Sequence, residues 1–185
     1  VCVTSCPSTY YALLSDRMCY SVATLPAGNS LFADNYSGLW VATCPIAPLT
    51  FGDRNQKLCV AICPGTGYYA DPSSRQCETA CTNSSYFADQ FTSSCVLTCP
   101  ASQSTFGDPS SYTCVTVCTN NLFADNYTRR CVVQCPASVA TFGYDQDWTC
   151  LATCPTGWFS YNITRMCVTG CPTPYFADSD RKACV

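Results

Sequence analysis

Cysteine recurs along the whole chain as pairs spaced C-x-x-x-C, and the pairs return every 17 to 21 residues. Each stretch between pairs carries an aromatic residue that lies eight positions before the next cysteine, as Phe123 does before Cys131. A unit repeated at a fixed period indicates an array in which each repeat contacts its neighbours, and not a globule. We therefore expect one continuous array of about ten cysteine-rich modules of 17 to 21 residues over residues 1–185.

Cysteine content indicates what holds such modules together. Nineteen cysteines among 185 residues is about 10%, which is typical of disulfide scaffolds in an oxidising compartment. The chain lacks long helical periodicity of apolar residues, so each module can bury little more than one aromatic, one Val and a disulfide. We predict a small disulfide-rich fold with little regular secondary structure, in which tandem single-disulfide β-hairpin modules stack into an elongated rod.

The module at residues 122–136 shows how the local sequence predicts a hairpin. Residues 122–124 are expected to form a short strand, and residues 125–128 carry the Asp and Asn that favour turns. Residues 129–132 are expected to return as the second strand. The constant spacing from aromatic to cysteine then reflects the fixed register of the hairpin.

One interruption of the repeat constrains the disulfide pairing. Ala23 and Trp40 stand where two cysteines are expected. Their joint loss favours a rule that joins the second cysteine of each pair to the first cysteine of the next pair. Pairing within each C-x-x-x-C unit would instead leave Cys19 and Cys44 without partners. Residues 6–98 and 99–185 also suggest a duplication of five modules, and the second block has cysteines at both interrupted places.

The rule predicts the disulfides Cys6–Cys19, Cys44–Cys59, Cys63–Cys77, Cys81–Cys95, Cys99–Cys114, Cys118–Cys131, Cys135–Cys150, Cys154–Cys167 and Cys171–Cys184. Cys2 is left over, and we expect it to pair outside this segment or to stay unpaired. Zinc is the competing use of cysteine, but its usual sets are C-x2-C or C-x4-C with further Cys or His, and this chain has no His. We expect neither a metal nor a cofactor.

Two charged positions also repeat. Asp follows the aromatic by two residues in seven modules, as Asp125 does, and a basic residue often precedes the cysteine by two, as Arg129 does. A repeated carboxylate is compatible with calcium, but without a D-x-D-x-D-G loop we expect a turn cap instead. The basic residue is expected to face the Asp across the hairpin, as an exposed ion pair contributing about 0–1 kcal/mol.

Four N-x-S/T sequences predict glycosylation, at Asn35, Asn83, Asn126 and Asn162. Three of them lie three residues after a module aromatic, where the hairpin turns, so a glycan would project from the array; Asn83 is placed differently. Trp40 has two interpretations, as a ligand-contacting aromatic or as a side chain that fills the space of the missing disulfide, and we favour the second.

The sequence also argues against several function classes. Only 11% of the residues are charged, the net charge is −3, and the Lys and Arg residues are scattered, so no basic patch for nucleic acid is present. No apolar run approaches the length of a membrane span. No catalytic constellation is visible, so we expect no enzyme. Because both ends fall within a repeat, we expect the chain to be a segment of a longer array.

The unit C-P-x(n)-[FY]-A-D-x5-C-V-x2-C resembles the furin-like and growth-factor-receptor type of cysteine-rich repeat. It is most similar to the cysteine-rich repeat arrays in surface proteins of ciliates and other single-celled eukaryotes. The resemblance covers all 185 residues and implies a rod of stacked modules.

These observations lead us to expect a secreted, extracellular structural protein that self-associates into a surface fibre or coat and carries covalent glycans. The alternative is the stalk or ligand-binding ectodomain of a cell-surface receptor or adhesin, or a variable surface antigen.

Overall fold

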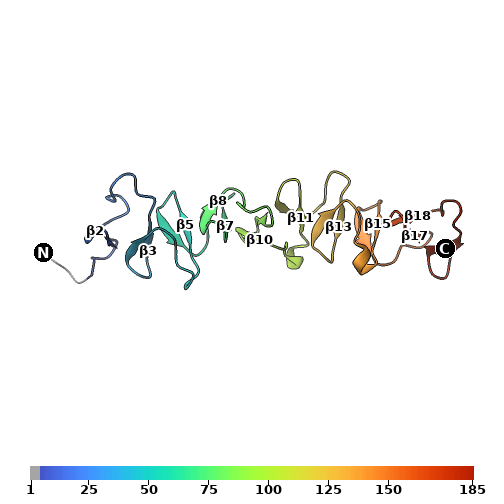
Figure 1. Ribbon diagram of the computed structural model, residues 1–185, viewed down its shortest axis with the longest axis horizontal. Coiled ribbons are helices and arrows are strands. Elements are labelled where there is room, and N and C mark those ends of the chain that lie inside the picture. Colours follow the sequence, from blue (N-terminus) through green and yellow to red (C-terminus); the bar gives the residue numbers. More distant parts are fainter. Residues whose placement is uncertain (1–4) are drawn as a thin grey trace. The chain divides into compact units, whose positions relative to one another are not determined.

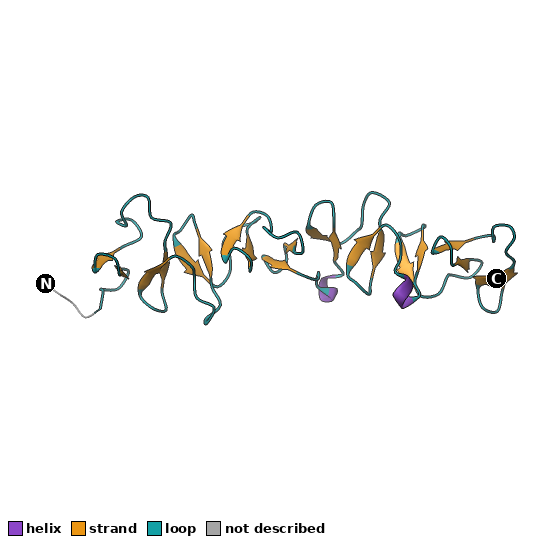
Figure 2. Cartoon of the chain, viewed as in Figure 1, coloured by secondary structure: helices purple, strands orange, loops and turns teal. Residues whose placement is uncertain are grey.

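The structure is a computed structural model that describes residues 5–185 and separates into two compact units, Val1–Val96 and Leu97–Val185. Short strands dominate both units, and the only helices among the described residues are two single 3₁₀ turns (Figures 1 and 2). The strands of the first unit are β1 (Tyr11–Leu13), β2 (Met18–Tyr20), β3 (Phe32–Asp34), β4 (Leu39–Val41), β5 (Phe51–Asp53), β6 (Leu58–Val60), β7 (Tyr69–Asp71), β8 (Gln76–Glu78), β9 (Phe87–Asp89) and β10 (Ser94–Val96).

The second unit repeats this order of short strands. Its strands are β11 (Phe106–Asp108), β12 (Thr113–Val115), β13 (Phe123–Asp125), β14 (Arg130–Val132), β15 (Phe142–Tyr144), β16 (Thr149–Leu151), β17 (Phe159–Tyr161), β18 (Met166–Val168), β19 (Ala177–Asp178) and β20 (Ala183–Cys184). The two 3₁₀ turns, η1 (Ala101–Gln103) and η2 (Ala137–Val139), each follow a Cys-Pro step and precede the next hairpin.

Each module folds as an antiparallel hairpin whose register follows from the repeat. In the hairpin β13–β14, Phe123 lies opposite Val132, Ala124 opposite Cys131 and Asp125 opposite Arg130. The expected strand at residues 122–124 was therefore wrong by one residue, because the ladder includes Asp125 and leaves Leu122 outside. The constant distance from aromatic to cysteine is the span of this hairpin, as the sequence predicted.

The turn that joins the two strands ends in a residue with left-handed backbone conformation, two positions before the cysteine. Arg75, Arg129 and Arg165 have φ of 59°, 56° and 59°, and the N–H of each donates to the carbonyl of the residue four positions earlier. Gly38 occupies the same place in the hairpin β3–β4, where glycine adopts this conformation without a steric cost. This turn directs the carbonyl of the left-handed residue toward the preceding hairpin.

Consecutive hairpins within a unit are joined by one parallel backbone bridge each. At each bridge, the middle residue of the first strand donates its N–H to the carbonyl of the left-handed residue in the next hairpin. Ala33 donates to the Lys57 carbonyl at 2.8 Å, and Gly143 donates to the Arg165 carbonyl at 2.8 Å. The middle residue is small because the next hairpin lies against it, and Ala33 is completely buried. Each unit therefore stacks its hairpins in chain order.

Nine disulfides, from Cys6–Cys19 to Cys171–Cys184, each close one module as a loop with a sequence separation of 13 to 15 residues. The pairs are the same nine that the pairing rule predicts from the sequence. Closing a 15-residue loop stabilises a fold by about 3 kcal/mol in the chain-entropy model. Stacked single-disulfide hairpins, the predicted fold class, are thus confirmed within each unit.

Candidate functional site at the seams between hairpins

The interior of each unit lies at the interfaces between adjacent hairpins, which we call seams. At a seam, the aromatic residue of one module packs against the disulfide of the following module, so neither module completes this contact alone. These pairs are Phe32 with Cys44–Cys59, Phe51 with Cys63–Cys77, Phe106 with Cys118–Cys131, Phe123 with Cys135–Cys150, and Phe142 with Cys154–Cys167. Phe176, the aromatic of the last hairpin, is 77% exposed.

Three seams are also bridged by an arginine that reaches back to the preceding module. The Arg129 guanidinium lies over the Phe106 ring, with Cζ 4.4 Å from the ring centroid, and its Nη2 donates to the Thr105 carbonyl at 2.6 Å. Arg75 over Phe51 and Arg165 over Phe142 repeat the arrangement. Each arginine thus combines a cation–π contact with a charge-assisted hydrogen bond across the seam.

This arrangement corrects the expected ion pair between the basic residue and the Asp of its own hairpin. Left-handed backbone at Arg129 directs the side chain over the neighbouring module, where a planar guanidinium can stack on a ring and still donate to a carbonyl. The Asp at the other end of the turn is occupied by turn groups. In the last hairpin a basic residue does pair with its Asp, Arg181 with Asp178 at 3.8 Å, but Arg181 lies one place before the repeated basic position.

The repeated Asp caps the hairpin turn, as predicted, but it does so as a buried group. Asp125 is fully buried, and its carboxylate accepts hydrogen bonds from the backbone N–H groups of Tyr127 and Thr128 and from the Thr128 hydroxyl. Asp34 accepts the corresponding three bonds from Tyr36 and Ser37. The hydroxyl donor lies three residues after the Asp, so the spacing D-x-x-[ST] is a sequence signal that could have identified the buried cap.

One exception to this spacing supports its role. Gln56 stands three residues after Asp53, and Oδ2 of the buried Asp53 carboxylate has no hydrogen-bond partner.

Burial raises the pKa of Asp71, but hydrogen bonds from Thr82, Ser73 and Ser74 outweigh it, so that its pKa lies below the ordinary value. Because Thr82 belongs to the following module, the Asp71 cap also joins two modules.

Trp40 fills the place of the missing disulfide, which is the interpretation that the sequence favoured. It is 5% exposed and packs with Leu13, Leu25 and Ala33. Its ring lies edge-on to Tyr11 at 5.7 Å, so the module aromatic packs against Trp40 where other modules present a disulfide. The indole N–H donates to the Tyr20 carbonyl at 3.3 Å.

The four predicted glycosylation sites are all exposed, and their modification stays a prediction. Asn35, Asn126 and Asn162 lie in the turns of their hairpins, whereas Asn83 precedes strand β9. The hydroxyl residues of the Asn35 and Asn126 sequons, Ser37 and Thr128, also donate to the buried Asp caps. Cys2 lies outside the described residues.

Two searches for other kinds of site bear only on the part of the chain that the structure describes. No three His, Cys, Asp or Glu side chains gather there as a group able to hold a metal ion. No helix in residues 5–185 has the length and apolarity to cross a membrane. Comparisons of this chain with protein-family models, with curated proteins and with solved structures found no match.

Proposed function

We propose that this protein is a non-enzymatic extracellular structural array that self-associates into a surface fibre or coat. One observation carries the proposal: the modules complete their interiors only with neighbouring modules, through Phe–disulfide packing and the bridging arginines. A chain built in this way adds length without enclosing a large site, which suits a structural element. The density of disulfides fits an oxidising compartment, as does the resemblance to furin-like cysteine-rich repeats.

Self-association is supported by apolar residues that recur on the outside of the modules. Four of them occupy the short linkers between the cysteines of a C-x-x-x-C pair: Ile62, Leu97, Val117 and Val133, which are between 55% and 80% exposed. A repeated apolar patch of this kind is a common basis for protein association. A second exposed set, including Tyr36 and Tyr127, lies inside the sequons at the turns, where a glycan would shield it.

The linkers are therefore the proposed contact surface between copies, and the glycosylated turns are the surface that stays solvated. Sedimentation of the chain secreted from eukaryotic cells tests this division. The wild-type chain should gain mass as its concentration rises, and a variant with Ile62→Ser, Val117→Ser and Val133→Ser should stay monomeric. A matched control changes Tyr36→Ser and Tyr127→Ser, which should leave association unchanged. A wild-type chain that is monomeric at every concentration would contradict the fibre or coat and favour a stalk.

A further inference from the structure

Two seams, one in each unit, have the same backbone and different coverings. The Phe32 seam joins the hairpins β3–β4 and β5–β6, and the Phe123 seam joins β13–β14 and β15–β16. In both, the phenylalanine ring lies on a glycine: a Cβ at Gly52 would approach the Phe32 ring to 2.5 Å, and one at Gly143 would approach the Phe123 ring to 2.9 Å. The following disulfide packs against the ring in each case.

The Phe123 ring is covered by two further apolar side chains. Trp148 lies 5.2 Å from it, centroid to centroid, and Met166 packs against the same cluster. In the Phe32 seam, Lys57 occupies the position of Trp148. The Lys57 carbonyl accepts the N–H of Ala33 at 2.8 Å, and the Trp148 carbonyl accepts the N–H of the equivalent Ala124 at 2.7 Å. Gln76 occupies the position of Met166, since Gln76 pairs with Gly52 as Met166 pairs with Gly143.

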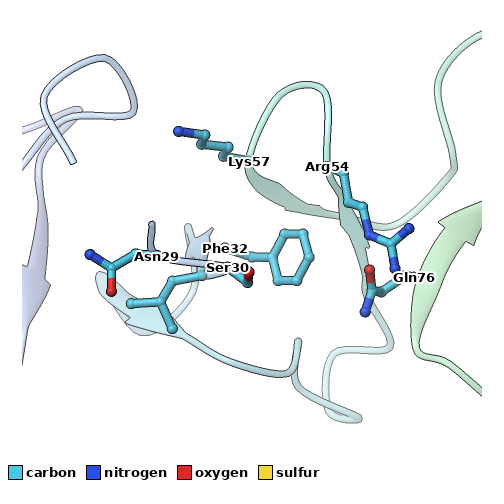
Figure 3. A pocket seen from close by; sticks show the side chains of 7 residues that line it. Asn29, Ser30, Phe32, Arg54, Lys57 and Gln76 are labelled. Carbon is cyan, nitrogen blue, oxygen red and sulfur yellow. The ribbon is translucent and has the colours of Figure 1, made fainter. Parts of the chain in front are cut away.

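Because Lys57 and Gln76 stand in place of a tryptophan and a methionine, a cavity of about 300 Å³ lies beside Phe32. It is lined by Asn29, Ser30, Leu31, Phe32, Arg54, Lys57 and Gln76. In Figure 3 the Phe32 ring points toward Arg54 and Gln76, with Asn29 and Ser30 on the other side. The seam thus keeps its backbone and its aromatic wall, but the side chains around the cavity are polar.

The charge of the lining indicates the ligand class. None of the seven lining residues is acidic, and two are cationic. Arg54 forms an ion pair with Glu78 at 3.4 Å, so part of its charge is already compensated, whereas Lys57 pairs with no acid in residues 5–185. Gln76 contributes an amide whose buried Oε1 has no hydrogen-bond partner among the described residues, so it can accept a bond from a hydroxyl. At the position of Arg54, the Phe123 seam carries Asp145.

We propose that the Phe32 seam binds an acidic sugar, one pyranose ring that carries a carboxylate. Cavity volume is at the lower end of small-molecule pockets, which suits a single ring. The Phe32 wall provides apolar contact for ring C–H groups, the amides of Gln76 and Asn29 bond hydroxyls, and Lys57 and Arg54 bind the carboxylate. This is a binding activity beyond the proposed structural role, and it is independent of whether the protein forms a fibre.

Titration of the intact, isotope-labelled chain by NMR tests the proposal with matched probes. Methyl β-D-glucuronide should shift the amide resonances of Ala33, Gly52 and Lys57. Methyl β-D-glucoside, which lacks only the carboxylate, should bind at least tenfold more weakly, and so should acetate, which lacks the ring. Absence of any shift with the glucuronide would overturn the proposal, and equal binding of either control probe would overturn the ligand class.

The Phe123 seam supplies the variant that separates binding from folding. Lys57→Trp with Gln76→Met installs the side chains that already pack on this backbone, so the double variant should fold as stably as the parent chain and lose glucuronide binding at least tenfold. Lys57→Met should weaken binding of the glucuronide and leave the weak binding of the glucoside unchanged. Undiminished binding by the double variant would contradict the assigned cavity.

Discussion

Substituting Arg129 by Met should loosen one seam and leave the others intact. The change keeps an unbranched side chain at a left-handed position and removes the guanidinium, so the backbone cost is nearly the same in both chains. Lost with the guanidinium are the bond to the Thr105 carbonyl at 2.6 Å and the contact with the Phe106 ring at 4.4 Å. The bond from Nη1 to Asn126 at 3.0 Å is more exposed and counts for less.

The free energy of opening this seam should fall by about 2 kcal/mol. A hydrogen bond to a charged group contributes about 1.5–3 kcal/mol, and a cation–π contact about 0.5–2 kcal/mol. The buried Arg129 Nε has no hydrogen-bond partner, which offsets part of that gain at about 1–3 kcal/mol. A difference of about 2 kcal/mol corresponds to a roughly 30-fold change in an equilibrium constant.

Native-state hydrogen exchange measures this opening at the Gly107 amide, which bonds the Arg129 carbonyl across the seam at 2.8 Å. In Arg129→Met the exchange of this amide should accelerate about 30-fold, while that of Gly143, at the Arg165 seam, should not change. Arg129→Lys should give an intermediate value, since it keeps the charge and loses the planar fork.

Arg181→Met is the matched control, because Arg181 makes only an exposed pair with Asp178 and should contribute about 0–1 kcal/mol. Less than a twofold change at Gly107 in Arg129→Met, or an equal change at Gly143, would refute the bridging role of the arginine.

Three further perturbations address the other parts of the seams. Gly143→Ala would place a Cβ 2.8 Å from a sulfur and should lower the free energy of unfolding by about 1–3 kcal/mol, whereas Gly170→Ala, with nothing within 4 Å, should not; thermal denaturation compares them. Trp40→Ala should cost about 3–5 kcal/mol, seen as an earlier denaturant midpoint, and a loss below about 1 kcal/mol would exclude Trp40 from the core. Because folding lowers the pKa of Asp71, its contribution is complete above the ordinary value near 3.8 and is lost as the pH falls through the folded pKa; Asp71→Asn should flatten the stability profile there.

The hairpins and their disulfides could be predicted from the sequence because both depend on spacing. The eight-residue interval from Phe123 to Cys131 fixes a hairpin, and the joint absence of cysteines at Ala23 and Trp40 fixes the pairing rule. Local patterns are sufficient for such features, since a hairpin forms within one module. The D-x-x-[ST] cap was also present in the sequence, but its burial was not foreseen.

The arginine bridges and the cavity at the seams could not be predicted, because they depend on which way a side chain crosses between modules. Arg129 was expected to face Asp125 of its own hairpin, and only the left-handed backbone conformation sends it to the preceding module. Predicting the cavity beside Phe32 would have required the strand register, which shows that Lys57 and Gln76 occupy the positions that Trp148 and Met166 hold in the Phe123 seam. The elongated rod, the glycans and the self-association stay predictions.

Disulfide mapping of the unreduced protein tests the central claim, that each module is closed by a bond from one cysteine pair to the next. Proteolysis without reduction, followed by mass spectrometry, should recover peptides linked through Cys63–Cys77 and Cys135–Cys150. Peptides linked through Cys59–Cys63 or Cys131–Cys135 would contradict the hairpin modules and every seam described above.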